Sequence, residues 1–277
     1  MDDLVFGSRT YIMGILNLTP DSFSGDGVYM DPARALEEAE RIVEEGADII
    51  DIGGESTRPG SMPISEEEEI KRVIPVIKKI AKRVKIPISI DTNKSIVALQ
   101  SLENGASIIN DITGMSADIK MAEVVAKYNA RVVIMHMKGT TENMQECPAY
   151  IDVIEEIKER LSYLIDKALQ SGVKKENIII DPGIGFGKTT KHNLEILNNL
   201  SRFKEFGRPI LVGPSRKSFI GNVLGVEPGG RIFGTAASVA IAIKNGADIV
   251  RAHDVKAMKE VSKVSDAIAR SGESVYV

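Results

Sequence analysis

The stretch DPARALEEAERIVEEGADIIDI, residues 31–52, contains the unit from which the fold is built. Asp31 is a typical helix N-cap and Pro32 suits a first helical turn, so we expect a helix that begins here and stops at Gly46. The apolar run Ile49–Ile52 follows directly and is expected to be a buried strand. A helix that leads straight into a buried strand indicates a fold of repeated β–α units.

The same helix–Gly–Ala–strand junction recurs at ENGAS, around Gly105, and at KNGAD, around Gly246. The apolar runs are rich in Ile and Val on successive residues, which is typical of parallel strands buried on both faces. We expect strands at Tyr11–Leu16, Ile49–Ile52, Ile86–Ile90, Ser107–Asn110, Val132–Met135, Ile178–Ile180, Ile210–Val212 and Ile249–Arg251. No low-complexity linker interrupts this series, so residues 1–277 are expected to form a single domain.

Eight strands with intervening helices fit either an open doubly wound sheet or a closed barrel. An open sheet concentrates its ligand groups at one switch point, whereas a barrel collects them from many strand ends. Here nearly every expected strand ends in a polar group: Asn17, Asp51, Asp91, Asn110 and Asp111, His136, Asp181, Ser215 to Lys217, Arg251, His253 and Asp254. We therefore predict an α/β fold of the (β/α)₈ TIM-barrel type.

Composition excludes several classes of protein. The 277 residues are 43% hydrophobic and carry a formal net charge of −4, which gives no basic field for nucleic acid or for a membrane surface. No apolar stretch is long enough to span a membrane, and the N-terminal apolar run is too short for a secretory signal. Cys147 is the single cysteine, so no internal disulfide is expected, and its neighbours offer no cation to activate it as a nucleophile. We expect a soluble, cytoplasmic protein.

Individual motifs also allow less specific interpretations. Asp91 could simply cap the next helix, since Asp is a common N-cap. The segment GIGFGKTT nearly matches a phosphate-binding P-loop, but that motif requires a glycine at Pro182, so nucleotide hydrolysis is not indicated.

The three histidines do not form a zinc motif. His192 is expected at the surface, and His136 in packing or a structural hydrogen bond. His253 differs, because it alternates with Arg251 on an extended strand and would face the same anion.

Nine segments, taken together, resemble a known family. They are MGILNLTPDSF, DIGGESTRPGS, SIDT followed by Lys94, IINDITG, MHMKGTTENMQ, DPGIGFGK, GPSRKSFIG, GTAASVAIAIKNGA and RAHDV. In this order, from about residue 11 to residue 256, they resemble the segments of dihydropteroate synthases. The resemblance implies a transferase of folate biosynthesis, a sulfonamide target. It would condense 6-hydroxymethyl-7,8-dihydropterin pyrophosphate with p-aminobenzoate to give 7,8-dihydropteroate and pyrophosphate, by pyrophosphate loss to a pterin cation and arylamine attack.

The resemblance assigns the pterin ring to polar residues at the strand ends. Asp181 is expected to accept two hydrogen bonds from the pterin amino group and ring N–H, while Asn110 and Asp91 bond other ring nitrogens. Lys217 is expected to donate to the pterin carbonyl and ring nitrogen. Asp51 is expected to support the barrel mouth, with some pterin contact.

Further residues are assigned to the ring plane and to the second substrate. Met135 and Phe186 are expected to border the ring, and Ser218 to lie near the p-aminobenzoate carboxylate. Thr57 and Arg58 are expected in a mobile loop that helps to close over that substrate.

The resemblance assigns the pyrophosphate to Arg251 and His253, together with Asn17, which is also expected to ligate Mg²⁺ as the cofactor. The residues expected to act in catalysis are Asp91, Lys217, Arg251 and His253. Loops 18–29 and 55–63 are expected to exclude water. The family usually reads DSFSDGG where Gly25 and Asp26 are exchanged here, so the role of Asp26 stays open. Gly139–Thr141 also departs from many relatives, and we expect only a loop difference there.

The resemblance also implies a homodimer with small-molecule substrates. Two other functions stay open on the residues alone. One is another pterin-binding barrel, such as a methyltetrahydrofolate methyltransferase domain, and the other is a noncatalytic pterin-binding protein.

Overall fold

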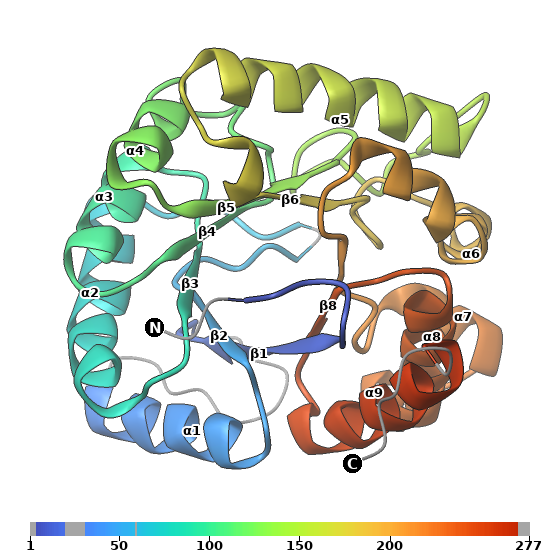
Figure 1. Ribbon diagram of the computed structural model, residues 1–277, viewed down its shortest axis with the longest axis horizontal. Helices are drawn as coiled ribbons and strands as arrows, with labels where there is room; N and C mark the ends of the chain where they lie inside the picture. Colours follow the sequence, from blue (N-terminus) through green and yellow to red (C-terminus); the bar gives the residue numbers. More distant parts are fainter. Residues whose placement is uncertain (1–3, 20–30, 59, 271–277) are drawn as a thin grey trace.

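A computed structural model of the chain describes residues 4–19, 31–58 and 60–270. The described residues form one parallel sheet of eight strands in the order β6-β5-β4-β3-β2-β1-β8-β7. The strands are β1 (Tyr11–Asn17), β2 (Ile49–Gly53), β3 (Ile88–Asp91), β4 (Ile108–Asp111), β5 (Arg131–Met135), β6 (Ile178–Asp181), β7 (Leu211–Val212) and β8 (Ile249–Ala252). A parallel bridge between Ile180 and Ile210 joins the two edges, so the sheet closes into a ring (Figure 1).

Helices follow the strands and cover the outside of the ring (Figure 1). They are α1 (Pro32–Glu44), α2 (Glu66–Arg83), α3 (Ser95–Glu103), α4 (Met121–Tyr128), α5 (Val153–Gln170), α6 (Thr190–Asn198), α7 (Ser218–Leu224), α8 (Ile232–Lys244) and α9 (Val255–Ala269). Short 3-10 helices occupy Lys175–Asn177, Leu200–Phe206 and Pro228–Gly230. This arrangement confirms the predicted (β/α)₈ barrel. Among the helices of residues 4–19, 31–58 and 60–270, none has the length and apolar character that crossing a bilayer would require.

All the expected strands are present, with small differences at their ends. Strand β3 begins at Ile88 and not at Ile86, and Pro87 precedes it, a residue without an N–H to donate to a neighbouring strand. Ile210 is an isolated bridge outside β7 and follows Pro209. Most strands run one residue further than expected at the C-terminal end, so several of the polar groups belong to the strands themselves.

The predicted helix boundaries are confirmed, and one connection is repeated. Asp31 accepts hydrogen bonds from the N–H groups of Ala33 and Arg34 at the start of α1. At the three predicted Gly–Ala junctions the helix ends in a glycine at positive φ: Gly46 at 101°, Gly105 at 114° and Gly246 at 103°. In each case the alanine that follows donates its N–H to a carbonyl in the last turn, at 3.1, 3.0 and 2.9 Å. This closure turns the chain from helix to strand within two residues.

The interior of the ring changes character along the strands. Its lower part is an apolar layer of Tyr11, Met13, Ile49, Ile108, Val133, Ile179, Leu211 and Ile249. Side chains alternate along a strand, so the next residue on the same face lies two positions later. On β2, β4, β6 and β8 that residue is Asp51, Asn110, Asp181 and Arg251. The C-terminal mouth of the barrel is therefore polar, and this is where the cavities lie.

Candidate active site

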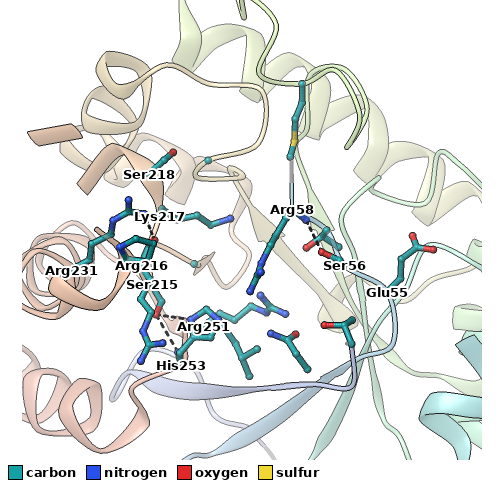
Figure 2. Close-up of a pocket in the computed structure, with 18 of the residues that line it drawn as sticks. Glu55, Ser56, Arg58, Ser215, Arg216, Lys217, Ser218, Arg231, Arg251 and His253 are labelled. Atoms are coloured by element: carbon teal, nitrogen blue, oxygen red, sulfur yellow. Dashed lines mark hydrogen bonds between the residues drawn. The ribbon is translucent and has the colours of Figure 1, made fainter. Parts of the chain in front are cut away.

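The mouth of the barrel holds a cavity of about 440 Å³, a size suited to a small organic ligand. Figure 2 shows Ser215 to Ser218, from the β7–α7 loop and the start of α7, on one side together with His253. Glu55, Ser56 and Arg58 from the β2–α2 loop lie on the other side, and Arg251 lies between them. The lining also includes Ile15, Asn17, Thr19, Met144, Gln145, Gly185, Gly213, Pro228 and Arg231. We call this space the outer cavity.

A narrower pocket of about 30 Å³ lies deeper in the barrel, and we call it the inner pocket. Its lining comprises Asp91, Asn110, Ile112, Met135, Asp181, Ile184 and Phe186. It shares four residues with the outer cavity: Thr57, Gly213, Lys217 and Arg251. The two spaces are therefore adjacent compartments of one site, with Lys217 and Arg251 at their boundary.

Arg251 connects the carboxylates at the base of the site. Its Nε donates to Asp51 Oδ2 at 2.6 Å, and a terminal nitrogen donates to Asp91 Oδ2 at 2.8 Å. Asn110 donates to the same Asp51 oxygen at 3.0 Å. Asp51 Oδ1 is buried and has no hydrogen-bond partner among the described residues, a costly state for a carboxylate oxygen. The network is thus tightly bonded but retains an acceptor for a further donor.

Burial shifts the proton equilibria of the inner pocket. It raises the pKa of Asp181 to about 6, although the Gly183 N–H at 2.7 Å and the charge of Lys188 act in the opposite direction. It likewise raises the pKa of Asp91, against the opposing charge of Arg251. Burial, reinforced by Arg251, lowers the pKa of Lys217 to about 8. Several groups that face one small pocket therefore titrate near neutrality, which is typical of functional sites.

One wall of the inner pocket is apolar. Met135 and Phe186 pack in a cluster with Ile112 and Met144. The Lys217 ammonium lies 4.0 Å from the centre of the Phe186 ring, within the range of a cation–π contact. Carboxylates and an amide on one side, and the apolar side chains of Met135 and Phe186 on the other, form a slot suited to a flat polar ring.

Lys188 organises the β6–α6 loop that carries this wall. It is only 2% exposed, and its ammonium donates to Phe186 O at 2.9 Å and to His136 Nδ1 at 3.0 Å. Burial lowers the pKa of His136 to about 2, so the ring is a neutral acceptor. A Cβ on Gly183 would lie 1.9 Å from His136 O, so only glycine fits there. His136 therefore has the expected structural role, whereas the role of Lys188 in this loop was not predicted from the sequence.

An ion cluster holds the β2–α2 loop, which carries Thr57 and Arg58. The Lys94 ammonium lies 2.7 Å from Glu55 Oε2 and 2.6 Å from Glu69 Oε2. Glu55 also accepts the N–H of Ile64 at 2.8 Å. Neither glutamate was among the predicted site residues. Glu69 is the buried member of an acidic run that looks like a solvated helix start.

The structure brings the predicted site residues together at one mouth. The outer cavity is lined by Asn17, Thr57, Arg58, Lys217, Ser218, Arg251 and His253. The inner pocket is lined by Asp91, Asn110, Met135, Asp181 and Phe186. Asp51 accepts a hydrogen bond from Asn110 at the base of this pocket. Asp91 does not cap α3, whose N-cap is Lys94. Residues 20–30, which include the Gly25 and Asp26 exchange and most of loop 18–29, lie outside the described residues, as does Pro59 in loop 55–63.

Comparisons with known proteins agree with this geometry. The family described as pterin binding enzyme matches residues 13–253. The dihydropteroate synthase of Clostridium beijerinckii is 51% identical over 265 residues, covering 95% of this chain and 96% of that protein. The Yersinia pestis dihydropteroate synthase in complex with a sulfonamide drug aligns with a TM-score of 0.92 at 43% identity, over 95% of each chain.

A second solved structure is similar over a comparable length. The Clostridium difficile dihydropteroate synthase, determined in the presence of pteroic acid, aligns with a TM-score of 0.89 at 49% identity, over 96% of this chain and 98% of that chain. With its barrel, its two-compartment site and these matches over nearly the whole length, the chain belongs to the dihydropteroate synthase family of pterin-binding transferases.

Proposed function

We propose that the two compartments divide the dihydropteroate synthase reaction between them. The inner pocket binds the pterin ring of 6-hydroxymethyl-7,8-dihydropterin pyrophosphate, and the outer cavity binds the pyrophosphate and p-aminobenzoate. The observation that carries this assignment is the boundary at Lys217 and Arg251, where a buried acidic slot opens into a wider cavity lined by cations. The bond that breaks would lie at this boundary.

The pterin ring is a set of donors and acceptors on a flat frame, and the inner pocket offers the complement. Asp181 accepts from the amino group and an adjacent ring N–H, while Asn110 and Asp91 bond other ring nitrogens. Lys217 donates to the carbonyl oxygen. Because the pocket holds only about 30 Å³ as it stands, the side chains at its boundary must move to admit a bicyclic ring.

The wider cavity supplies groups for the remaining parts. Asn17, Arg251 and His253 receive the pyrophosphate. Ser218 lies near the p-aminobenzoate carboxylate, and Thr57 and Arg58 help to cover that substrate. The sulfonamide complex of the Yersinia pestis relative supports a site for such benzene-ring compounds.

The chemistry needs no protein nucleophile. The carbon–oxygen bond to pyrophosphate breaks with its electron pair going to the leaving group, and the pterin ring delocalises the cation. Asp91 and Asp181 stabilise this cation, while Arg251 offsets the charge that grows on the pyrophosphate. The arylamine nitrogen then forms the carbon–nitrogen bond and loses a proton. Loop 55–63 keeps water away from the cation, and loop 18–29 is assigned the same task, although most of it lies outside the described residues.

The donors near the pyrophosphate position fit Mg²⁺ as an ion carried with the substrate. The described residues contain no group of three His, Cys, Asp or Glu side chains that could hold a metal alone. Mg²⁺ commonly keeps several waters and binds through one or two protein groups plus substrate phosphates. Asn17 lines the outer cavity and would supply one amide oxygen. When bound, the ion would neutralise negative charge on the pyrophosphate.

A homodimer through the α8–α9 face is also part of the proposal. Exposed apolar side chains gather on these helices: Phe233 at 84%, Ile241, Val264 and Ile268. Exposed apolar side chains that lie together often mark an interface with another chain. Analytical ultracentrifugation should give twice the mass of one chain. The substitution Phe233→Asp should reduce the measured mass to that of a single chain. A cytoplasmic location is proposed as well, supported by the single cysteine, which allows no internal disulfide.

The decisive experiment measures product formation. Purified protein with dihydropterin pyrophosphate, p-aminobenzoate and Mg²⁺ should form dihydropteroate and release pyrophosphate in equal amounts. Transfer of a methyl group from methyltetrahydrofolate would favour a methyltransferase, and pterin binding without turnover would favour a binding protein. Calorimetry should also show that p-aminobenzoate binds only with pyrophosphate present. Equal binding without it would overturn the idea that pyrophosphate completes the second site.

A further inference from the structure

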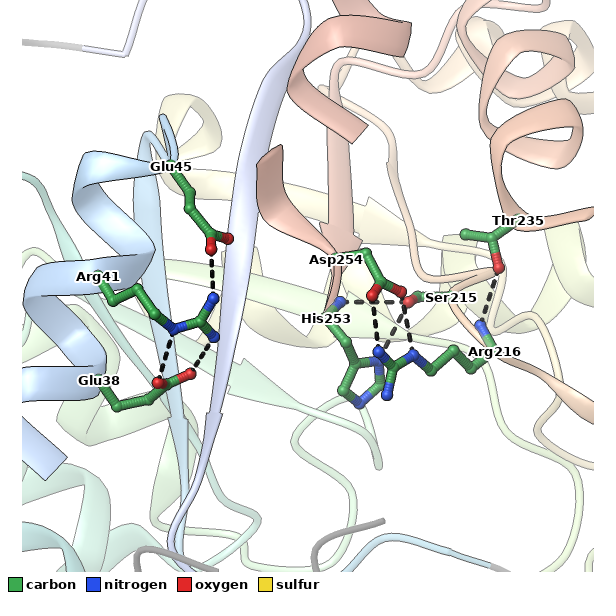
Figure 3. Close-up of polar contacts among 8 residues, drawn as sticks. All are labelled: Glu38, Arg41, Glu45, Ser215, Arg216, Thr235, His253 and Asp254. Carbon is green, nitrogen blue, oxygen red and sulfur yellow. Dashed lines mark hydrogen bonds and ion pairs between the residues drawn. The ribbon is translucent and has the colours of Figure 1, made fainter. Parts of the chain in front are cut away.

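Two side-chain contacts link the β7–α7 loop to the residues that follow β8 (Figure 3). Ser215 Oγ lies 3.0 Å from His253 Nδ1. The Arg216 guanidinium bonds both carboxylate oxygens of Asp254, at 3.0 and 2.6 Å. Consecutive residues of one loop thus bond consecutive residues of the other, which fixes Ser215 against His253 at the edge of the outer cavity.

The hydrogen bonds of Ser215 favour one of the two tautomers of the neutral His253 ring. Ser215 Oγ accepts the backbone N–H of His253 at 3.2 Å, so its own hydroxyl hydrogen remains to be donated. Ser215 is buried, and among the described residues the acceptor within reach of that hydrogen is His253 Nδ1. An imidazole nitrogen that accepts a hydrogen bond carries no proton. With Ser215 as the donor, the neutral ring carries its proton on Nε2.

The surroundings of His253 favour the neutral ring. Burial lowers the pKa of His253 to about 3, and Arg251, Arg216 and Lys217 act in the same direction. The opposing carboxylate, Asp254, is already bonded to Arg216. The other charged groups that line the neighbouring surface pocket with His253 are Glu38, Arg41, Glu45, Lys256 and Glu260. Glu38 and Glu45 pair with Arg41, so neither carboxylate faces the ring alone (Figure 3).

The conformation of Arg216 supports a dedicated role for this loop. Arg216 has a φ of 57°, in the left-handed region that residues with a side chain rarely adopt. Thr235 accepts its N–H at 3.1 Å, and Arg231 donates to its carbonyl at 2.9 Å. Thr235, Arg231 and Asp254 therefore hold Arg216 in this conformation. Its neighbours Ser215 and Lys217 then reach His253 and the inner pocket.

We propose that Ser215 is a positioning residue that holds His253 as the neutral Nε2–H tautomer, so that the ring donates one hydrogen bond to the departing pyrophosphate. The ring contributes a directed donor and no charge. Arg251 then supplies the positive charge, and pyrophosphate is released without deprotonation of the histidine. The part concerning pyrophosphate rests on the proposed function, whereas the tautomer can be tested on the free protein.

The tautomer is directly measurable, because the chain contains only three histidines. Protein labelled with ¹⁵N-histidine should show His253 with an unprotonated Nδ1 and a protonated Nε2, unchanged between pH 5.5 and 8.5. The substitutions His192→Asn and His253→Asn assign the signals. A protonated Nδ1, or titration of His253 near its ordinary pKa of about 6.5, would overturn the proposal without any variant of Ser215.

Kinetics of Ser215 variants test the consequence for the reaction. Ser215→Ala should lower kcat/KM for dihydropterin pyrophosphate about tenfold, the effect of one hydrogen bond, and add a further ionisation to the pH profile of the parent protein. Ser215→Thr keeps the hydroxyl and should restore both properties. The matched control is Ser101→Ala, which removes an equally buried hydroxyl that bonds Val97 O in α3.

The possible failures are distinguishable. If the parent protein forms no dihydropteroate, the proposed function fails, and the histidine spectrum still decides the tautomer. If the protein is active but Ser215→Ala changes neither the histidine spectrum nor the pH profile, the positioning role of Ser215 is wrong. If Ser215→Ala mixes the two tautomers and lowers kcat/KM while Ser101→Ala does not, the role is supported.

Discussion

The apolar layer inside the barrel that begins with Tyr11 and Met13, which we call the floor, and the polar mouth are built from the same strands. Their side chains nevertheless have opposite chemistry. On β6, Ile179 belongs to the apolar floor and Asp181, two residues later, belongs to the inner pocket. On β8, Ile249 and Arg251 are related in the same way. Because the backbone and the register are shared, the difference lies in side chains alone. The floor stabilises the ring, while the mouth spends part of that stability on buried charge.

The largest expected effect tests the mouth. Asp181→Asn keeps the acceptor for the Gly183 N–H but replaces the second carboxylate oxygen with a donor. Losing two charge-assisted hydrogen bonds to the pterin should lower kcat/KM about a thousandfold, while the free energy of unfolding in urea stays the same or rises. Activity near that of the parent, or a large loss of stability, would break the distinction between floor and mouth.

The next effect tests the floor on the same strand. Ile179→Ala leaves a cavity in the apolar layer and should lower the free energy of unfolding by about 2–5 kcal/mol. When activity is measured well below the unfolding transition, kcat/KM should stay close to that of the parent. A strong loss of activity in the folded variant would mean that the floor takes part in binding.

The pH dependence of pterin binding should be smaller and should have two limbs. Asp181 must be ionised to accept both donors, and its pKa is raised to about 6, so affinity should fall as the pH drops through that value. Lys217 must be protonated to donate, and its pKa is lowered to about 8, so affinity should also fall as the pH rises through that value. Each limb approaches tenfold per pH unit. Titration calorimetry checks this, and Asp181→Asn should remove only the acid limb.

The smallest effect concerns an arginine on the outside of the barrel. Arg41 lies between Glu38 and Glu45 on α1 (Figure 3), much as Arg251 lies between Asp51 and Asp91. The Arg41 side chain is 49% exposed, so water already solvates these charges. Arg41→Ala should change the free energy of unfolding by less than about 1 kcal/mol and leave kcat/KM unaltered. A larger loss would show that surface charge matters more than the comparison allows.

The fold could be predicted from the sequence because the patterns that indicate its helices and strands are local. Ile49–Ile52 is apolar on successive residues, and Gly46 ends the preceding helix in a conformation that glycine adopts easily. The strand ends then marked the mouth, so Asp51, Asn110, Asp181 and Arg251 could be found before their geometry was known. Their roles came from resemblance to a family, since a strand end alone does not say what a carboxylate binds.

The pairings inside the mouth could not be found in this way. Arg251 bonds Asp51 and Asp91, which lie 200 and 160 positions away in the chain, and no local pattern encodes such a contact. The sequence pointed Arg251 toward an anion shared with His253, whereas in the structure two carboxylates hold its guanidinium. Glu69 was hidden for a similar reason, because its burial depends on the packing of α2 and on Lys94.

The buried amine of Lys188 offers a chemical probe of how often the β6–α6 loop opens. Burial lowers its pKa to about 7, which favours the unprotonated amine that an acylating reagent can modify, although the side chain is only 2% exposed. An acylating reagent can reach it only while the loop is displaced. The rate at which Lys188 is acylated, followed by peptide mass spectrometry, would therefore report how often the loop that carries Phe186 opens. A ligand bound in the inner pocket should lower this rate of acylation.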